Sequence, residues 1–236
     1  MTPEIQILIV TAATIAFVHT LLGPDHYLPF AVMARARGWS LRKVTGITLV
    51  CGLGHIVGSI VLGFVGVALG TAIATLEWIE TVRGELAAWG LIAFGLVYLA
   101  WGLRRAHKGR PHSHLHAHGD LVHSHAHNHH GEHAHVHTAD DSKSLTPWAI
   151  FLIFVLGPCE PLIPLLMYPA ARESMLGVVL VTATFGLVTV VTMLGAVILT
   201  VWGLQRVKVP GLARFGHALA GGTVLVCGVS IHLVGH

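Results

Sequence analysis

The sequence has few charged residues and few cysteines for its length. Of its 236 residues only 11% are Asp, Glu, Lys or Arg, whereas 54% are hydrophobic, and the mean hydropathy is +0.73. Such a composition is too apolar for a soluble domain, so it predicts a polytopic membrane protein in contact with the lipid bilayer. The small formal net charge of +3 argues against a nucleic-acid partner, because the basic residues fall between apolar segments.

Other sequence motifs that are missing exclude some classes of function. The three cysteines, Cys51, Cys159 and Cys227, include no C-x-x-C pair, which argues against a disulfide framework. The sequence lacks the phosphate-binding pattern G-x-x-x-x-G-K-[ST], so ATP-driven activity would need another subunit. No Lys or Arg precedes the apolar residues 5–22, which therefore predict an uncleaved first helix and not a signal peptide. We expect neither enzymatic activity nor a resident cofactor.

Six apolar segments are long enough to cross a bilayer, which takes about 20 residues each. The expected fold is an all-α polytopic membrane protein with six transmembrane helices, at residues 5–34, 44–70, 86–103, 148–170, 176–202 and 212–234. Lys and Arg concentrate in the first, third and fifth connecting segments. The positive-inside rule therefore predicts that these segments are cytoplasmic and that both termini lie outside a bacterial or archaeal cytoplasmic membrane.

The two halves of the chain resemble one another. Gly-Pro-Asp-His at 23–26 has a counterpart in Gly-Pro-Cys-Glu at 157–160, and proline should interrupt a helix at each place. We expect a three-helix half at 1–106, a His-rich disordered loop at 107–146 and a second half at 147–236. Three spans per half would make the halves inverted repeats with interrupted helices 1 and 4, an arrangement that transporters use to build a midplane site.

Ionisable residues lie beside the first interruption. His19, Asp25 and His26 fall within eight residues at the end of an apolar segment. Asp25 alone is explained as a helix cap, but the two histidines are not. Because ionisable side chains are costly in hydrocarbon, the cluster predicts a site for a transported ion, and three potential ligands so close together favour a metal ion.

The second span carries a polar stripe. Cys51, His55 and Ser59 are each four residues apart and share one helix face, which predicts that they point into the bundle. A lone histidine there is often an interhelical hydrogen-bond donor. With two histidines in the adjacent span, we interpret His55 as a metal ligand.

Two residues of the fourth span can also serve the site. Glu160 is predicted to be a metal ligand, a partner of a ligating histidine or a proton carrier. Cys159 is either a thiolate ligand or a packing residue.

The third connecting segment is rich in histidine. Alternating H-x-H spacing among small polar residues cannot bury a core, so we expect disorder and weak binding of several divalent metal ions. A pH sensor is the rival interpretation, since imidazoles titrate near neutral pH. The predicted loop ligands are His112, His114, His116, His118, His123, His125, His127, His129, His130, His133, His135 and His137.

Taken together, His19, Asp25-His26, Leu-Gly-His at 53–55 and the His-rich loop resemble the nickel/cobalt transporters, which include high-affinity nickel permeases and NicO-type exporters. The second half shares only the span count and Gly-Pro-Cys-Glu-Pro at 157–161.

The resemblance implies a proton-coupled secondary transporter of Ni²⁺ or Co²⁺, or else Zn²⁺, possessing a transient site of four residues with Glu160 beside it. Those four residues are His19, Asp25, His26 and His55. Export is favoured over import because a cytoplasmic histidine loop would collect metal on the side where efflux begins. A nickel/cobalt uptake permease and a metal-delivery accessory protein are alternatives, and a homo-oligomer is compatible with each.

Two alternatives come from other classes. A thiol-disulfide electron relay would use the proline-flanked Cys159 and needs a second thiol within reach. A sulfite-type anion exporter would need helix dipoles and a cationic side chain deep in the membrane. The six expected spans have no deep Lys or Arg, which counts against the exporter.

Overall fold

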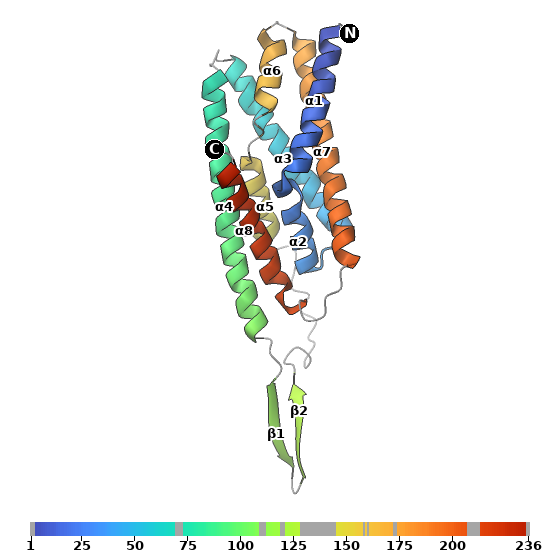
Figure 1. The fold of residues 1–236 in the computed structure, drawn as a ribbon, viewed down its shortest axis with the longest axis vertical. Coiled ribbons are helices and arrows are strands. Elements are labelled where there is room, and N and C mark those ends of the chain that lie inside the picture. Colours follow the sequence, from blue (N-terminus) through green and yellow to red (C-terminus); the bar gives the residue numbers. More distant parts are fainter. Residues whose placement is uncertain are drawn as a thin grey trace.

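The computed structural model describes residues 3–68, 73–108, 112–118, 121–127, 145–157, 159, 161–171, 174–206 and 213–234. Helices form an elongated bundle, with two strands projecting from one end (Figure 1). The helices are α1 (Pro3–Leu22), α2 (Leu28–Arg37), α3 (Leu41–Ala68), α4 (Ile73–Lys108), α5 (Leu145–Leu156), α6 (Leu162–Ala171), α7 (Met175–Arg206) and α8 (Gly216–Val234), with 3₁₀ turns η1 (Pro24–His26) and η3 (Ala213–Phe215).

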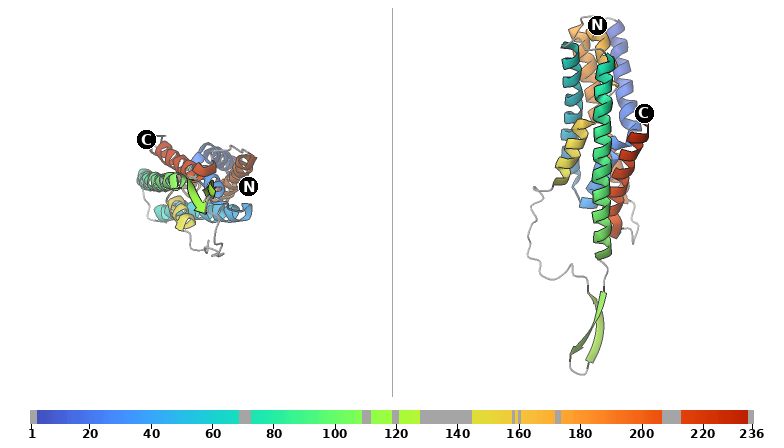
Figure 2. Two further views of the ribbon diagram at one scale, coloured as in Figure 1. Left: turned by 90° about the horizontal axis from the view of Figure 1, so that it is seen from below. Right: turned by 90° about the vertical axis from the view of Figure 1, so that its left-hand side faces the viewer.

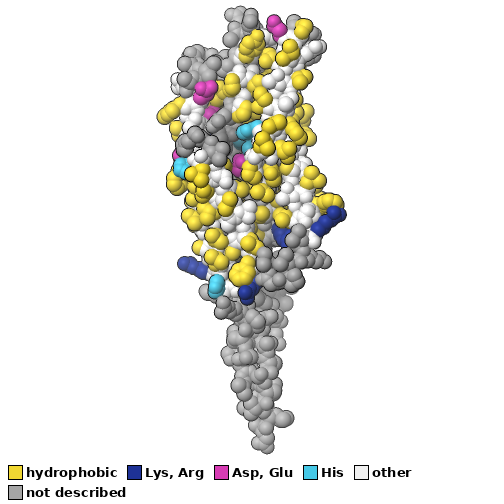
Figure 3. All heavy atoms as spheres, in the orientation of Figure 1, with side chains coloured by type: hydrophobic (Ala, Val, Ile, Leu, Met, Phe, Trp, Pro, Cys, Tyr) yellow, Lys and Arg dark blue, Asp and Glu magenta, His cyan; other side chains and the backbone are white. Residues whose placement is uncertain are grey.

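Five of the described helices are long and apolar enough to cross a membrane, so this is a multi-pass membrane protein. The qualifying stretches are Pro3–Leu22, Leu41–Val65, Thr75–His107, Met175–Arg206 and Gly216–Leu233. Hydrophobic side chains cover the visible face of the bundle (Figure 3), as expected for a surface that contacts lipid. The expected fourth span is divided, as predicted, into the short helices α5 and α6, so neither piece reaches the length of a span.

The first predicted interruption is present. α1 ends where the Gly23 N–H donates to the His19 carbonyl at 3.0 Å, and the turn η1 separates it from α2. Pro24 has no N–H and fits the first position of that turn. α2 then ends at Gly38, whose φ of 63° is left-handed and suits glycine.

The third span begins earlier than expected. We predicted residues 86–103, but α4 runs from Ile73 to Lys108. Glu77, Glu80 and Arg83 lowered the apparent hydropathy of its first turns, although they continue the helix. The statement that no deep cation exists was therefore wrong, because Arg83 lies inside a membrane-spanning helix.

Helices from different parts of the chain pack side by side. α4 lies along α8, and α1 lies along α7 (Figures 1 and 2). Glycines bring α4 and α8 into backbone contact: a Cβ at Gly221 would lie 2.3 Å from the Leu99 nitrogen, and one at Gly102 would lie 2.4 Å from the Ala218 nitrogen. Such small residues are typical of close helix packing in membranes.

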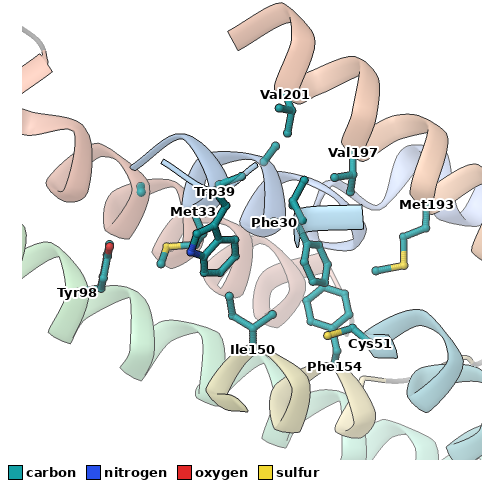
Figure 4. Packing of buried hydrophobic residues seen from close by; sticks show 14 residues of the cluster. Phe30, Met33, Trp39, Cys51, Tyr98, Ile150, Phe154, Met193, Val197 and Val201 are labelled. Atoms are coloured by element: carbon teal, nitrogen blue, oxygen red, sulfur yellow. The ribbon is translucent and has the colours of Figure 1, made fainter. Parts of the chain in front are cut away.

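The larger core cluster joins the two interrupted segments. Phe30 of α2 and Phe154 of α5 lie with ring centroids 4.4 Å apart, beside Cys51 and Met193 (Figure 4). This apolar contact packs α2 against α5 close to the two interruptions. A second cluster, which includes Cys159 and Phe185, packs α6 against α7.

Part of the predicted disordered loop is paired into strands. β1 (His112–His118) and β2 (Leu121–His127) form an antiparallel hairpin in which His114 pairs with His125 and His116 with His123. The alternation of histidine with other residues has the two-residue period of a strand, which the disorder prediction did not weigh. The remaining predicted loop ligands, His129, His130, His133, His135 and His137, lie outside the described residues.

Candidate functional site

A cavity of about 370 Å³ lies where the two interruptions meet. Its polar wall consists of the four predicted residues His19, Asp25, His26 and His55, and both Gly23 and Gly157 border it. Histidine and carboxylate side chains are visible in a hollow at mid-height of the apolar surface (Figure 3). The structure therefore brings together the four residues that the sequence singled out.

The histidine rings form a chain. The ring centroids of His19 and His26 are 5.0 Å apart, and those of His26 and His55 are 5.5 Å apart, with nearly perpendicular planes. Although His19 and His26 are separated by the end of α1, the turn η1 returns His26 to the same side. Gly23 is required beneath them, because a Cβ there would lie 2.6 Å from His26 Nδ1.

Backbone carbonyls orient two of the rings. His26 Nδ1 lies 3.2 Å from the Gly23 carbonyl oxygen and 3.3 Å from Asp25 Oδ2. His55 Nδ1 lies 3.2 Å from the carbonyl oxygen of Phe154 at the end of α5. A neutral imidazole that donates through Nδ1 presents the lone pair of Nε2 on its other side.

The Nε2 atoms of His19, His26 and His55 are buried and have no hydrogen-bond partner. Buried polar atoms without partners are rare and point to a ligand or a solvent molecule. Among the residues that the structure describes, however, no three His, Cys, Asp or Glu side chains already stand at the spacing of a closed metal site. A metal ion would require these rings to rotate toward one another.

Cys159 lies at the second interruption, between α5 and α6. Its side chain is fully buried, and its backbone N–H donates to Oε2 of Glu80 at 2.9 Å. Its carbonyl accepts from the N–H of Leu162 at 2.9 Å, which begins α6. All three cysteines are buried and none forms a disulfide. Glu160, the other predicted residue of this segment, lies outside the described residues.

An ion pair at this interruption was missed by the sequence analysis. Glu80 of α4 is fully buried and is hydrogen-bonded to Arg83, whose Nη2 donates to the Val155 carbonyl at 2.9 Å. The one sequence signal was the three-residue spacing of opposite charges in an apolar context. Arg83 is therefore a cationic side chain inside the bundle, and its charge is paired with that of Glu80.

The predicted polar face of α3 is confirmed as buried, since Cys51, His55 and Ser59 all face the interior. Only His55 borders the cavity. Ser59 instead accepts a hydrogen bond from Arg83 Nη1 at 3.4 Å. The predicted polar stripe of α3 thus contributes one residue to the histidine cluster and another to the contacts of the Glu80–Arg83 pair.

Comparison with known families decides between the interpretations. The family model described as "Cytochrome C biogenesis protein transmembrane region" matches residues 28–230. The chain belongs to this family. No curated protein matches the sequence, and no solved structure matches the fold.

The nickel/cobalt transporter interpretation was therefore wrong, and with it the predicted transport of nickel, cobalt or zinc and its direction. It rested on His19, Asp25-His26, residues 53–55 and the composition of one loop. These motifs are short, whereas the family match extends over most of the membrane-spanning chain. The thiol-disulfide alternative, which had been ranked lower, agrees better with the match.

Proposed function

We propose that the protein is a membrane-embedded thiol-disulfide electron carrier in which Cys159 is the exchanging thiol. Membership of the cytochrome C biogenesis family favours this class of function. The observation that carries the assignment to one residue is the position of Cys159, which lies at the helix interruption with its backbone held by the Glu80 carboxylate. Asp25 occupies the corresponding position in the first half, so the two interruptions do not supply a cysteine pair.

The second thiol that such a relay needs can come from the donor protein, so a single thiol of this chain can carry electrons through mixed disulfides. The Cys159 thiolate attacks a partner protein's disulfide, forming one S–S bond while the other partner sulfur leaves as a thiolate and takes up a proton. A donor protein's dithiol then attacks the mixed disulfide and releases the second partner thiol. The donor's other thiolate displaces Cys159, leaving the donor oxidised and Cys159 reduced. Two electrons pass from donor to acceptor, and the buried thiol must become accessible in each half-reaction.

Cysteine substitution tests this proposal. In full-length protein in liposomes, Cys159→Ser is expected to abolish disulfide reduction on one side by a dithiol on the other. Cys51→Ala and Cys227→Ala serve as matched controls, because both are buried cysteines within helices. Electron transfer that survives in Cys159→Ser, or in the protein without all three cysteines, would refute the proposal.

We further propose that the histidine cluster binds a divalent cation, as the sequence analysis predicted for these residues, with no transport implied. The observation in favour is that three histidines which border one cavity each have a buried Nε2 atom without a hydrogen-bond partner. Zinc bonded to two imidazoles at tetrahedral angles holds their centroids about 5 Å apart, given a Zn–N distance near 2 Å. The observed ring separations of 5.0 and 5.5 Å are close to this value.

Bound zinc per chain tests the cluster. Replacing His19, His26 and His55 together by alanine should lower the tightly bound zinc by one ion per chain. His217→Ala is the control, since His217 Nδ1 lies 2.8 Å from the Tyr98 hydroxyl and not in the cluster. Zinc held by the unaltered loop contributes equally to all samples. Equal zinc in the triple variant and the wild type would exclude the site.

We also propose that the chain forms six spans in two inverted halves, with α1–α2 and α5–α6 as the interrupted spans. Helix contacts support this arrangement, because exchanging the halves converts several of the contacts into others that are present. α1 packs on α7 as α5 packs on α3, and α2 packs on α8 as α6 packs on α4. Cysteines introduced one at a time along both halves can be sorted into lipid-facing and buried positions by their labelling. The proposed symmetry predicts the same pattern at corresponding positions of the two halves.

The hairpin end of the bundle is proposed to face the cytoplasm, with both termini outside. Basic side chains gather at that end in Figure 3, as the positive-inside rule requires. A cysteine introduced as Ser113→Cys, in a cysteine-free chain, should react with an impermeant thiol reagent only after the cells are permeabilised. Labelling in intact cells would reverse the orientation.

A further inference from the structure

The interruption between α5 and α6 exposes two kinds of backbone group. α5 ends at Leu156, so the carbonyl oxygens of its last turn have no hydrogen-bond donor within the helix. α6 begins at Leu162, so the N–H groups at its start have no acceptor within the helix. Inside a membrane such groups must be satisfied by the protein, because lipid offers no hydrogen bonds.

One ion pair on α4 reaches both sides of this interruption. Arg83 Nη2 donates to the carbonyl oxygens of Val155 at 2.9 Å and Gly157 at 3.4 Å. Glu80 accepts from the N–H of Cys159 through Oε2 and from Arg83 through Oε1. The pair therefore connects the end of α5 to the residue that precedes α6.

The polarity of the pair matches the two helix ends. The C-terminal end of a helix carries partial negative charge and the N-terminal end partial positive charge. The Arg83 guanidinium lies at the carbonyl end of α5, and the Glu80 carboxylate lies on the amide side that leads into α6. The opposite arrangement would place each charge against a backbone dipole of the same sign.

The neighbouring helix α3 leaves room for this contact. A Cβ at Gly58 would lie 3.0 Å from Arg83 Nη2 and 3.3 Å from the Val155 carbonyl oxygen. One turn of α3 thus supplies a glycine under the guanidinium and the Ser59 hydroxyl beside it. α3 therefore packs against the Arg83 side chain at the end of α5, while α4 supplies the contact with the backbone of Cys159.

We infer that Glu80 and Arg83 are positioning residues for Cys159: they hold its backbone at the interruption, and their opposite charges balance one another next to this residue. This inference rests on the proposed role of Cys159 in thiol exchange. The two charges nearly cancel in the native protein, so removal of either one should change the reactivity of the thiolate in opposite directions. A purely structural pair would give changes of the same direction, because either loss would loosen the same segment.

The test measures the rate at which Cys159 reacts with a small membrane-permeant disulfide reagent. The full-length chain carries Cys51→Ala and Cys227→Ala so that only Cys159 can react, and thermal unfolding of each protein in detergent verifies folding. Glu80→Gln keeps an oxygen that can accept from the Cys159 N–H but leaves the Arg83 charge unbalanced. The rate should rise about tenfold, because an unneutralised cation stabilises the thiolate.

Two further variants complete the comparison. Arg83→Gln leaves the carboxylate unbalanced and should lower the rate about tenfold. Arg83→Lys keeps the positive charge, so its reaction rate should be close to that of the protein with Arg83. This variant takes the place of Arg83→Gln in the comparison if Arg83→Gln fails to fold. Glu77→Gln, one turn away on the same helix and exposed, is the matched control and should leave the rate unchanged.

Changes in the same direction for Glu80→Gln and Arg83→Gln would overturn the inference, as would equal rates or no reaction in all proteins. If Arg83→Gln does not fold, a rate in Arg83→Lys as high as that in Glu80→Gln would overturn it. The proposed function fails separately, if Cys159→Ser still transfers electrons between partners. Because the small reagent replaces both partners, the positioning result does not depend on that outcome.

Discussion

His55 of α3 holds the end of α5, since its Nδ1 lies 3.2 Å from the carbonyl oxygen of Phe154 in the buried interior. His55→Ala removes this hydrogen bond and enlarges the adjacent cavity, so the free energy of unfolding should fall by about 1–2 kcal/mol. Unfolding in mixed micelles measures the change. His107→Ala is the control, because His107 makes a similar contact with the Leu103 carbonyl on an exposed surface. An equal loss for both variants would contradict a specific role for His55.

The α4–α8 contact predicts different effects at two adjacent glycines. A Cβ at Gly221 would lie 2.3 Å from the backbone nitrogen of Leu99, whereas one at Gly222 would meet nothing within 4 Å. Gly221→Ala must separate the two helices and should cost about 1–3 kcal/mol or more. Gly222→Ala should be neutral or stabilising, since alanine favours the helix by up to about 1 kcal/mol. Equal unfolding temperatures for the two variants would refute the close approach.

The buried ion pair predicts a large effect from removal of one partner. Glu80→Ala leaves Arg83 charged and unpaired inside the bundle, and the expected loss of stability is about 3–5 kcal/mol. Glu85→Ala tests a contact of the same helix that is one-third exposed, that between Glu85 and His232 at 3.5 Å. That variant should lose only about 0–1 kcal/mol. Chemical denaturation of both proteins compares them, and a loss below 1 kcal/mol for Glu80→Ala would show that the pair is not buried in the membrane-bound protein.

At the end of α2, a substitution of Gly38 is expected to strain the backbone without causing a steric clash. Gly38 has a φ of 63°, and a Cβ there would meet nothing within 4 Å. Gly38→Ala should therefore destabilise the protein by about 1 kcal/mol through backbone strain alone. Gly46→Ala, also with open space around the Cβ but within helix α3, should not. Thermal unfolding separates the two, and Gly38→Asn should recover part of the loss because asparagine tolerates this conformation.

Local rules predicted the interruptions and the polar cluster. Proline after glycine at 23–24 and 157–158 indicated breaks in apolar segments, because proline cannot donate the hydrogen bond that continues a helix. Ionisable residues near the first break indicated a site there, and His19, Asp25 and His26 border a cavity together with His55. These inferences needed only neighbouring residues and the cost of polarity in lipid.

Long-range relationships were not accessible in the same way. Glu80 and Cys159 are far apart in sequence, and nothing local shows that the carboxylate meets that amide. The charges of Glu80 and Arg83 also lowered the hydropathy that located the third span, so the residues that organise the interruption were assigned to a connecting segment.

The family assignment failed because short motifs were given more weight than the pattern of the whole chain. An Asp-His pair and a histidine-rich loop can arise in unrelated membrane proteins, since a few polar residues satisfy both patterns. The family match, in contrast, extends over residues 28–230.

The glycine contacts between α4 and α8 have a mechanical consequence for thiol exchange. Two helices whose backbones touch at Gly95, Gly102 and Gly221 cannot slide past one another without a clash. α4 also carries the Glu80–Arg83 ion pair that contacts Cys159. We therefore expect α4 and α8 to keep their relative position. Under the proposed function, we expect access to the Cys159 sulfur to come from displacement of the short helix α6 and opening of the contact with Glu80, not from separation of α4 and α8.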